Sequence, residues 1–210
     1  MKTPEHPIFL ESVNYIRSKL GITGLDQVQQ SILERIIHSS GDFSLPSCLR
    51  FSPGACEAAV DALRNGAKIV TDTYMAKAAI TPMAKRTLNA DVQCILRMAP
   101  TSIDSTLTTK SAIGMREMWL DFQGQEQLLY SPLVVIGSSP TALISLLDLV
   151  EAGCKTPSLI IGMPVGFIGV SESKNRLLNS ECPHIVLDGS KGGASVAAAT
   201  TNALLRVAEN

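Results

Sequence analysis

The segment ERIIHSSGD, residues 34–42, places a histidine where it could donate a proton. His38 is one of only three histidines in the chain, and Gly41 is a natural end for the helix that the preceding residues predict. Glu34 lies one turn before His38 on the same side of that helix. The carbonyl groups of the last turn favour the charged imidazolium by about 0.3–1 kcal/mol. His38 is therefore a candidate proton donor, although a surface histidine that merely ends a helix has the same pattern.

Three glycine-rich segments could bind an anion through backbone N–H groups. They are VVIGSSPTAL (134–143), LIIGMPVGFIGVSESK (159–174) and IVLDGSKGGASVAAA (185–199), and each joins an apolar run to a helical stretch. Glycine lets a ligand approach the backbone closely, and the N-terminus of a helix offers unpaired N–H groups. Three such turns together predict a wide ligand with several negative groups, although tight turns in an α/β protein need glycine in any case.

No segment matches a nucleotide or hydrolase fingerprint. GMPVGFIG differs from GxGxxG, GSKGGAS lacks the rest of a Walker A loop, and no GxSxG occurs. The five cysteines are scattered without ligand spacing, so we expect free thiols and no metal site. His184 lies inside an apolar run and is typical of a core histidine. A generic nucleotide-binding enzyme is therefore disfavoured.

The elements that must position these turns are five short aliphatic runs. Each run is nearly continuous in apolar character, which predicts strands buried on both faces. Helical stretches between them predict right-handed crossovers and a parallel sheet. We expect a three-layer α/β sandwich with a five-stranded parallel sheet, flavodoxin-like in plan, whose ligand lies beyond the carboxyl ends of the strands. The strand order stays open, and the predicted strands are 67–72, 91–96, 132–137, 157–162 and 183–188.

Helices are predicted before and between the strands. Residues 101–119 begin as a polar loop and enter a helix near Ser111. Serine caps set two further starts, with Ser138 or Ser139 before Pro140, and Ser171 after the second glycine-rich turn. An alanine-rich helix follows Gly193. The other predicted helices are 6–20, 25–40, 55–66, 140–153 and 171–179.

Composition restricts the class of protein. The 210 residues suit one domain, 1–210, and the hydrophobic fraction of 45% supports a sizeable core. A net charge of −1 gives no basic field for nucleic acid. No apolar run has the length of a membrane span, and the N-terminus lacks the pattern of a secretory signal. We therefore expect a cytoplasmic protein with neither a nucleic acid nor a membrane as partner.

The motifs together resemble the precorrin-8X methylmutases (precorrin isomerases) of corrinoid biosynthesis. The resemblance spans nearly the full chain, in the same order and with similar spacing. The segment GMPVGFxGxxESK is close to a signature of that family. The matching segments are ERIIHSSGD, VTDTYMAKAAI, GSSPTAL, GMPVGFIGVSESK and DGSKGGASVAAATTNAL.

The resemblance implies an isomerase. Its reaction moves a methyl group from ring carbon C-11 to C-12 of precorrin-8X, giving hydrogenobyrinate, or cobyrinate in the cobalt-containing route. The family's members are α/β homodimers without a cofactor, and His38 corresponds to the histidine proposed to protonate the macrocycle. The acidic side arms of this tetrapyrrole substrate would suit basic residues such as Lys77, Lys110, Arg116 and Lys191. The implied substrate-binding residues are Ser12, Asp72, Met75, Lys77, Lys110, Ser111, Ser138, Gly162, Met163, Pro164, Gly166, Lys191 and Gly192.

The chain departs from the family pattern at three places. Thr-Arg-Ser is here Thr109-Lys110-Ser111, and lysine does not reproduce the bidentate fork of arginine. The usual Asn-Ala before Pro140 is Ser138-Ser139, and the usual Gly-Arg is Gly189-Ser190. These replacements leave open an alternative, a tetrapyrrole-binding paralogue with reduced or no catalysis. The sequence does not decide whether the substrate carries cobalt.

Overall fold

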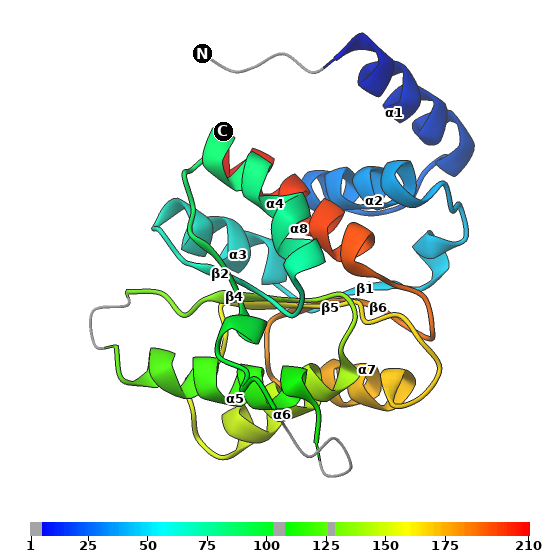
Figure 1. Cartoon of the computed structure of the whole chain (residues 1–210). Coiled ribbons are helices and arrows are strands. Elements are labelled where there is room, and N and C mark those ends of the chain that lie inside the picture. Colours follow the sequence, from blue (N-terminus) through cyan, green and yellow to red (C-terminus); the bar gives the residue numbers. More distant parts are fainter. Residues whose placement is uncertain (1–5, 103–107, 126–128) are drawn as a thin grey trace.

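The computed structural model describes residues 6–102, 108–125 and 129–210. One sheet lies between two layers of helices (Figure 1). Its strands are β1 Leu49–Phe51, β2 Ile69–Thr71, β3 Val92–Cys94, β4 Leu133–Ile136, β5 Leu159–Gly162 and β6 His184–Leu187. The helices are α1 Pro7–Leu20, α2 Gln27–Ser40, α3 Ala55–Arg64, α4 Tyr74–Arg86, α5 Lys110–Gln123, α6 Pro140–Glu151, α7 Val170–Leu178 and α8 Ala194–Glu209, with short 3₁₀ turns η1 Leu45–Ser47 and η2 Ile95–Arg97.

The sheet has the order β1-β6-β5-β4-β2-β3. Strands β2 to β6 pair in parallel, which confirms the predicted five-stranded parallel arrangement. Among these five strands the first in the chain lies between the second and the third, as in flavodoxin-like sheets. A sixth strand, β1, pairs antiparallel with β6 and was not predicted. It is only three residues long, so its sequence carries no periodicity, and its extended form depends on its partner.

Alternate residues of each strand enter different cores. In β4, Leu133 and Val135 face the layer of α2, α3, α4 and α8, whereas Val134 and Ile136 face α5, α6 and α7. Every residue of β4, β5 and β6 is buried. Burial on both faces is the physical reason that the strands read as continuous apolar runs rather than alternating ones.

The predicted helix ends are confirmed for two helices and wrong for a third, and the capping box of α2 was not predicted. Asp26 and Gln29 form a capping box at the start of α2, and Gly41 ends that helix in the left-handed conformation, as predicted. Ser139 caps α6 with Pro140 in its first turn, which also confirms a prediction. The predicted Ser171 cap was wrong. Gly169 is the N-cap of α7, and this helix starts at Val170 without a side-chain cap.

One helix escaped the sequence analysis. Helix α4 follows β2 and contains Pro82 in its interior, which normally indicates a break rather than a continuous helix. Helix α4 packs on α8, so tertiary contacts stabilise a helix that its local sequence predicts only weakly. None of the described helices combines the length and the apolar character that a bilayer crossing requires.

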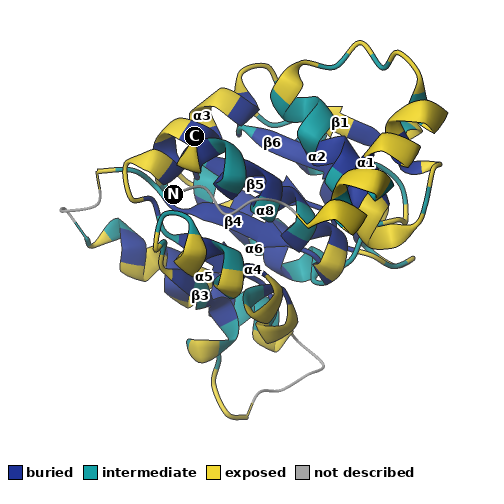
Figure 2. Ribbon diagram, turned by 90° about the horizontal axis from the view of Figure 1, so that it is seen from above, coloured by how far each residue is buried: buried dark blue, intermediate teal, exposed yellow. Residues whose placement is uncertain are grey.

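Helix α1 packs outside α2 and is largely exposed (Figure 2). Val13 and Ile16 are its buried residues. Arg17 grips the buried carboxylate of Glu34 on α2 with two hydrogen bonds, Nε to Oε1 at 2.7 Å and Nη2 to Oε2 at 3.0 Å. Since a paired guanidinium satisfies a buried carboxylate well, this contact fixes α1 on α2.

Candidate active site

The sheet changes winding direction between β2 and β4. These neighbouring strands lead into α4 and α6, which cover opposite faces of the sheet (Figure 1). Asp72 follows β2 directly, and Gly137 follows β4. In open parallel sheets such a switch point at the carboxyl ends is the usual place for a ligand. The carboxyl edge around Asp72 and Gly137 is therefore the candidate active site.

The carboxylate of Asp72 binds the backbone N–H groups at the N-terminus of α6. Its Oδ2 atom accepts hydrogen bonds from the backbone N–H groups of Gly137 at 3.1 Å, Ser138 at 2.6 Å and Ser139 at 2.9 Å. The sequence predicted that these donors would face an anionic ligand, and that prediction was wrong for all three. The reason is that a neighbouring strand delivers a carboxylate to them within the fold. What Ser138 can still offer a ligand is its half-buried hydroxyl group.

The Asp72 carboxyl is fully buried. Burial raises its pKa, although the N–H groups of Ser138, Ser139 and Gly137 act in the opposite direction. Its second oxygen, Oδ1, is buried and finds no hydrogen-bond partner among the described residues. Asp72 thus joins the loop after β2 to the start of α6, at the cost of an incompletely solvated charge.

Backbone hydrogen bonds join the loop after β5 to the loop after β6. Gly193 N–H donates to Met163 O at 2.9 Å, and Gly166 N–H donates to Ser190 O at 3.1 Å. A Cβ atom on Gly192 would lie 2.1 Å from Met163 O, so only glycine permits this approach. Met163 and Pro164 are buried beneath the contact.

Gly162 has a similar packing role. It ends β5 in the core, where a Cβ atom would lie 2.5 Å from the side chain of Leu177 on α7. Gly166 is half-buried and has a φ of +143°. The glycines of this turn therefore allow the protein to pack closely against itself, and Gly166 is the more accessible of the two.

Lys191 connects this edge to the helix that carries His38. Its ammonium bonds to Asp42 Oδ2 at 2.7 Å and to Ser44 Oγ, both just beyond the end of α2. Lys191 and Ser44 hold the pKa of Asp42 well below its usual range. The pair is exposed, so Lys191 remains within reach of a ligand. Asp42 and Ser44 were missed from the sequence, although the polar run SSGD after the helix was a signal.

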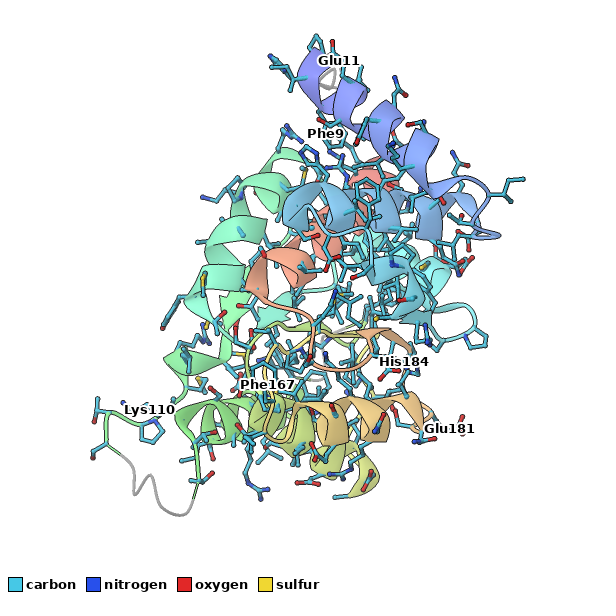
Figure 3. The ribbon with its side chains drawn as sticks, turned by 90° about the vertical axis from the view of Figure 1, so that its right-hand side faces the viewer. Phe9, Glu11, Lys110, Phe167, Glu181 and His184 are labelled. Carbon is cyan, nitrogen blue, oxygen red and sulfur yellow. The ribbon has the colours of Figure 1, made fainter. Side chains whose placement is uncertain are left out.

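His38 is exposed in the last turn of α2, as predicted. Its ring makes a T-shaped contact with that of Phe9 on α1, with 5.0 Å between the ring centroids, and Figure 3 labels Phe9 on α1. Glu34 does not serve as the expected acidic neighbour. Both of its oxygens bind Arg17, and Oε1 also accepts from Gln30 at 2.8 Å. The packing of α1, which the helix pattern could not show, redirects this carboxylate.

The remaining predicted residues lie at helix starts. Met75 is exposed and Lys77 half-buried in the first turn of α4. Lys110 and Ser111 begin α5, whose cap Thr109 contacts Thr141 of α6 at 2.7 Å between hydroxyl oxygens. The Lys110 ammonium donates to Thr101 O at 2.8 Å.

Ser12 is the residue least joined to the others. Its hydroxyl donates to Ile8 O within α1, at 2.9 Å. It lies three residues after Phe9, on the neighbouring part of the helix face that meets His38. Arg116 is exposed five residues further along α5 than Ser111. The structure thus brings the predicted residues of the β2, β4, β5 and β6 loops to one edge, whereas the hydrogen bond of Ser12 stays within α1.

Exposed apolar side chains also lie at this edge, and of these only Met75 was predicted. Phe167 and Ile168 are 88% and 90% exposed after β5, and Tyr74 and Met75 are 55% and 67% exposed at the start of α4. Such a group offers a surface for the face of a large flat ligand. Figure 3 shows Phe167 between Lys110 on the left and His184 and Glu181 on the right.

His184 takes no part in this edge. It is 6% exposed, and its Nδ1 lies 2.8 Å from Cys182 O. This confirms the prediction of a core histidine. All five cysteines are free thiols, as expected.

A model of the family described as precorrin-8X methylmutase matches residues 7–207. The chain belongs to the precorrin-8X methylmutase family. It is 37% identical over 218 residues to the cobalt-precorrin-8 methylmutase of Synechocystis sp., which covers 97% of this chain and 96% of the relative. It is 36% identical to the precorrin-8X methylmutase of Pseudomonas aeruginosa, over 94% of this chain and 93% of the relative.

A solved structure of the family supports the fold. Precorrin-8x methyl mutase from Thermus thermophilus superposes with a TM-score of 0.82 and is 30% identical in sequence, over 97% of this chain and 98% of that chain. This match covers nearly the whole chain, so the carboxyl edge described above is part of a precorrin-8X methylmutase fold.

Replacing Asp72 by Asn tests the buried carboxyl. Because its pKa is raised, the folded state binds a proton more readily than the unfolded chain as the pH falls from about 7 towards about 4. As the pH falls over this interval, we expect the unfolding free energy of wild type to rise relative to that of Asp72→Asn. Urea titrations at several pH values measure both. Asp61→Asn, on the exposed side of α3, controls for the loss of one charge. A difference of opposite sign would mean that the three N–H bonds outweigh burial, and a constant difference would mean that they cancel it; either result contradicts the raised pKa.

Proposed function

We propose that this chain is a precorrin-8X methylmutase, which moves a methyl group from C-11 to C-12 of precorrin-8X or its cobalt form. Family membership over residues 7–207 supports the reaction. The observation that carries the assignment of the site is the link from Lys191 to Asp42, at the end of the helix that bears His38. Through it, an exposed imidazole and the glycine-rich carboxyl edge form one connected surface.

His38 is the proposed proton donor. An exposed histidine at a helix C-terminus can deliver a proton to the macrocycle, which leaves a neutral imidazole. The reaction is an isomerisation, in which one carbon–carbon bond breaks and another forms within the same molecule. It requires a held ring conformation and a placed proton, and no covalent intermediate with the protein.

The substrate would lie against the carboxyl edge. We propose that its flat face meets the exposed apolar group of Phe167, Ile168, Tyr74 and Met75. Its carboxylate arms would pair with the ammonium groups around the edge and with the backbone of the β5 and β6 loops. The ammonium groups are those of Lys77, Lys110 and Lys191. The proposal includes no cofactor.

We also propose a cytoplasmic homodimer. The family resemblance supports the dimer, as do the exposed apolar residues Ile8, Leu10 and Tyr15 on α1. Light scattering coupled to gel filtration should give twice the mass of one chain, and a monomer at all concentrations would contradict the dimer. Subcellular fractionation tests the location.

Replacing His38 by Ala should abolish isomerisation and leave product binding largely intact. Loss of a general acid lowers the rate by about 10²–10⁴-fold. The assay follows the visible spectrum of precorrin-8X as it changes to that of hydrogenobyrinate, and titration with hydrogenobyrinate measures binding. Ser39→Ala, the adjacent exposed position, is the matched control. Full activity of His38→Ala would remove this residue from the mechanism.

The same assay separates the two functions that the sequence left open. Turnover by the wild-type chain supports the enzyme. Tight binding of hydrogenobyrinate without turnover would instead favour a tetrapyrrole-binding paralogue, which the replacements at Lys110, Ser138 and Ser190 make worth testing.

Replacing Lys110 by Arg should preserve activity or lower the KM for precorrin-8X, by up to about tenfold, because a guanidinium can bind a carboxylate through two parallel hydrogen bonds. Steady-state kinetics measure the change, with Lys85→Arg at the far end of α4 as control. A marked loss of activity in Lys110→Arg would show that the hydrogen bond from Lys110 to Thr101 O matters more for activity than a contact of residue 110 with the substrate.

A further inference from the structure

Lys174 is a buried lysine without a role in the function proposed above. It lies on α7, inside the segment ESK of the family signature, and its exposed fraction is 0%. Its ammonium donates to Gly189 O at 2.7 Å and to Lys191 O at 2.6 Å, in the turn between β6 and α8. A buried charge needs such partners, and here backbone carbonyls provide them.

Three consecutive carbonyls of this turn are held from the same neighbouring segment. Lys174 binds those of Gly189 and Lys191, and Gly166 N–H binds that of Ser190. A trans peptide is planar, so the next N–H along the chain points away from each held carbonyl. The N–H groups of Ser190, Lys191 and Gly192 therefore point away from the donors that hold the preceding carbonyls. Within the described residues, the backbone hydrogen bonds of the loops include none that these three groups donate.

We propose that Lys174 is a positioning residue, whose ammonium holds the 189–191 turn so that the backbone and side chain of Lys191 and the backbone of Gly192 face the substrate. This inference rests on the proposed function, because Lys191 and Gly192 are proposed substrate contacts. It adds a residue that does not touch the substrate.

The same turn also anchors the proton donor. The side chain of Lys191 binds Asp42 and Ser44, which directly follow the helix of His38. A turn that loosens on loss of the Lys174 ammonium would therefore weaken both substrate binding and the placement of His38. These two effects separate Lys174 from a lysine that merely fills space in the core.

The charge of Lys174 can be switched by pH. Burial lowers its pKa to about 8, against an ordinary value of 10.5, while Asp188 and Cys48, which face it, act in the opposite direction. Between these two values the folded protein has released a proton that the unfolded chain keeps. The contribution of Lys174 to folding stability therefore rises with pH in this range. The tether weakens over the same range, because a neutral amine has fewer and weaker donors.

The experiment compares wild type with Lys174→Met, Lys174→Gln and Lys174→Arg. Methionine keeps the unbranched apolar stem, so packing is largely retained. We expect Lys174→Met to raise the KM for precorrin-8X and the Kd for hydrogenobyrinate by about tenfold or more, with a smaller change in kcat. Lys174→Arg should restore part of the affinity. Lys85→Met, an exposed lysine of α4, is the matched control.

A second measurement needs no substrate. Amide hydrogen exchange at Gly166 and Gly193, whose N–H groups bond Ser190 O and Met163 O across the turn, should be faster in Lys174→Met than in wild type, and in wild type it should accelerate more above about pH 8 than the chemical exchange rate explains. The wild-type affinity for hydrogenobyrinate should fall over that pH range, and the affinity of Lys174→Met should not. Lys174→Gln gives the same comparison if Lys174→Met does not fold.

Two results would overturn the inference. One is unchanged exchange at Gly166 and Gly193 in every Lys174 variant that folds, and the other is wild-type affinity in Lys174→Met. A wild-type chain that neither converts precorrin-8X nor binds hydrogenobyrinate would instead defeat the proposed function. In that case the exchange measurement still decides whether Lys174 holds the turn.

Discussion

The carboxyl edge of the sheet depends on buried charges that backbone groups satisfy. On one side the carboxylate of Asp72 takes three N–H groups at the start of α6, and on the other the ammonium of Lys174 takes two carbonyls before α8. Each charge is costly to bury alone, and each becomes tolerable because the loop folds around it. The loops in turn have a defined shape because they must enclose these charges.

This arrangement decides which groups remain for a ligand. Donors that sequence reasoning assigned to the substrate, at residues 137–139, are already used by Asp72. Exposed side chains such as Lys110 and Phe167 remain available for the substrate contacts proposed above, as does the backbone of the turn that Lys174 holds. A rigid frame of internally satisfied loops that presents a few exposed groups suits a reaction in which the protein mainly holds a ring and places a proton.

Local patterns predicted what local physics determines. The five parallel strands were readable because both faces are buried, and the ends of α2 were readable because Gly41 and the polar residues around it act within one turn. Pairings between distant segments were not. Strand β1 exists only against β6, Asp72 meets a turn some 65 residues away, and Glu34 is claimed by Arg17 of another helix. Lys174 was hidden for the same reason, since its partners lie beyond the next strand.

The two fixed ends of α2 have a consequence for how this chain can vary. Asp26 sets where the helix begins, Gly41 sets where it ends, and Glu34 fixes its rotation against α1. One residue inserted or deleted between Glu34 and His38 would turn the imidazole by roughly 100° around the helix axis. The number of residues between Glu34 and His38 therefore sets the direction of the imidazole. A change of length in this short stretch would misdirect His38, in addition to disturbing the buried side chains of Ile36 and Ile37.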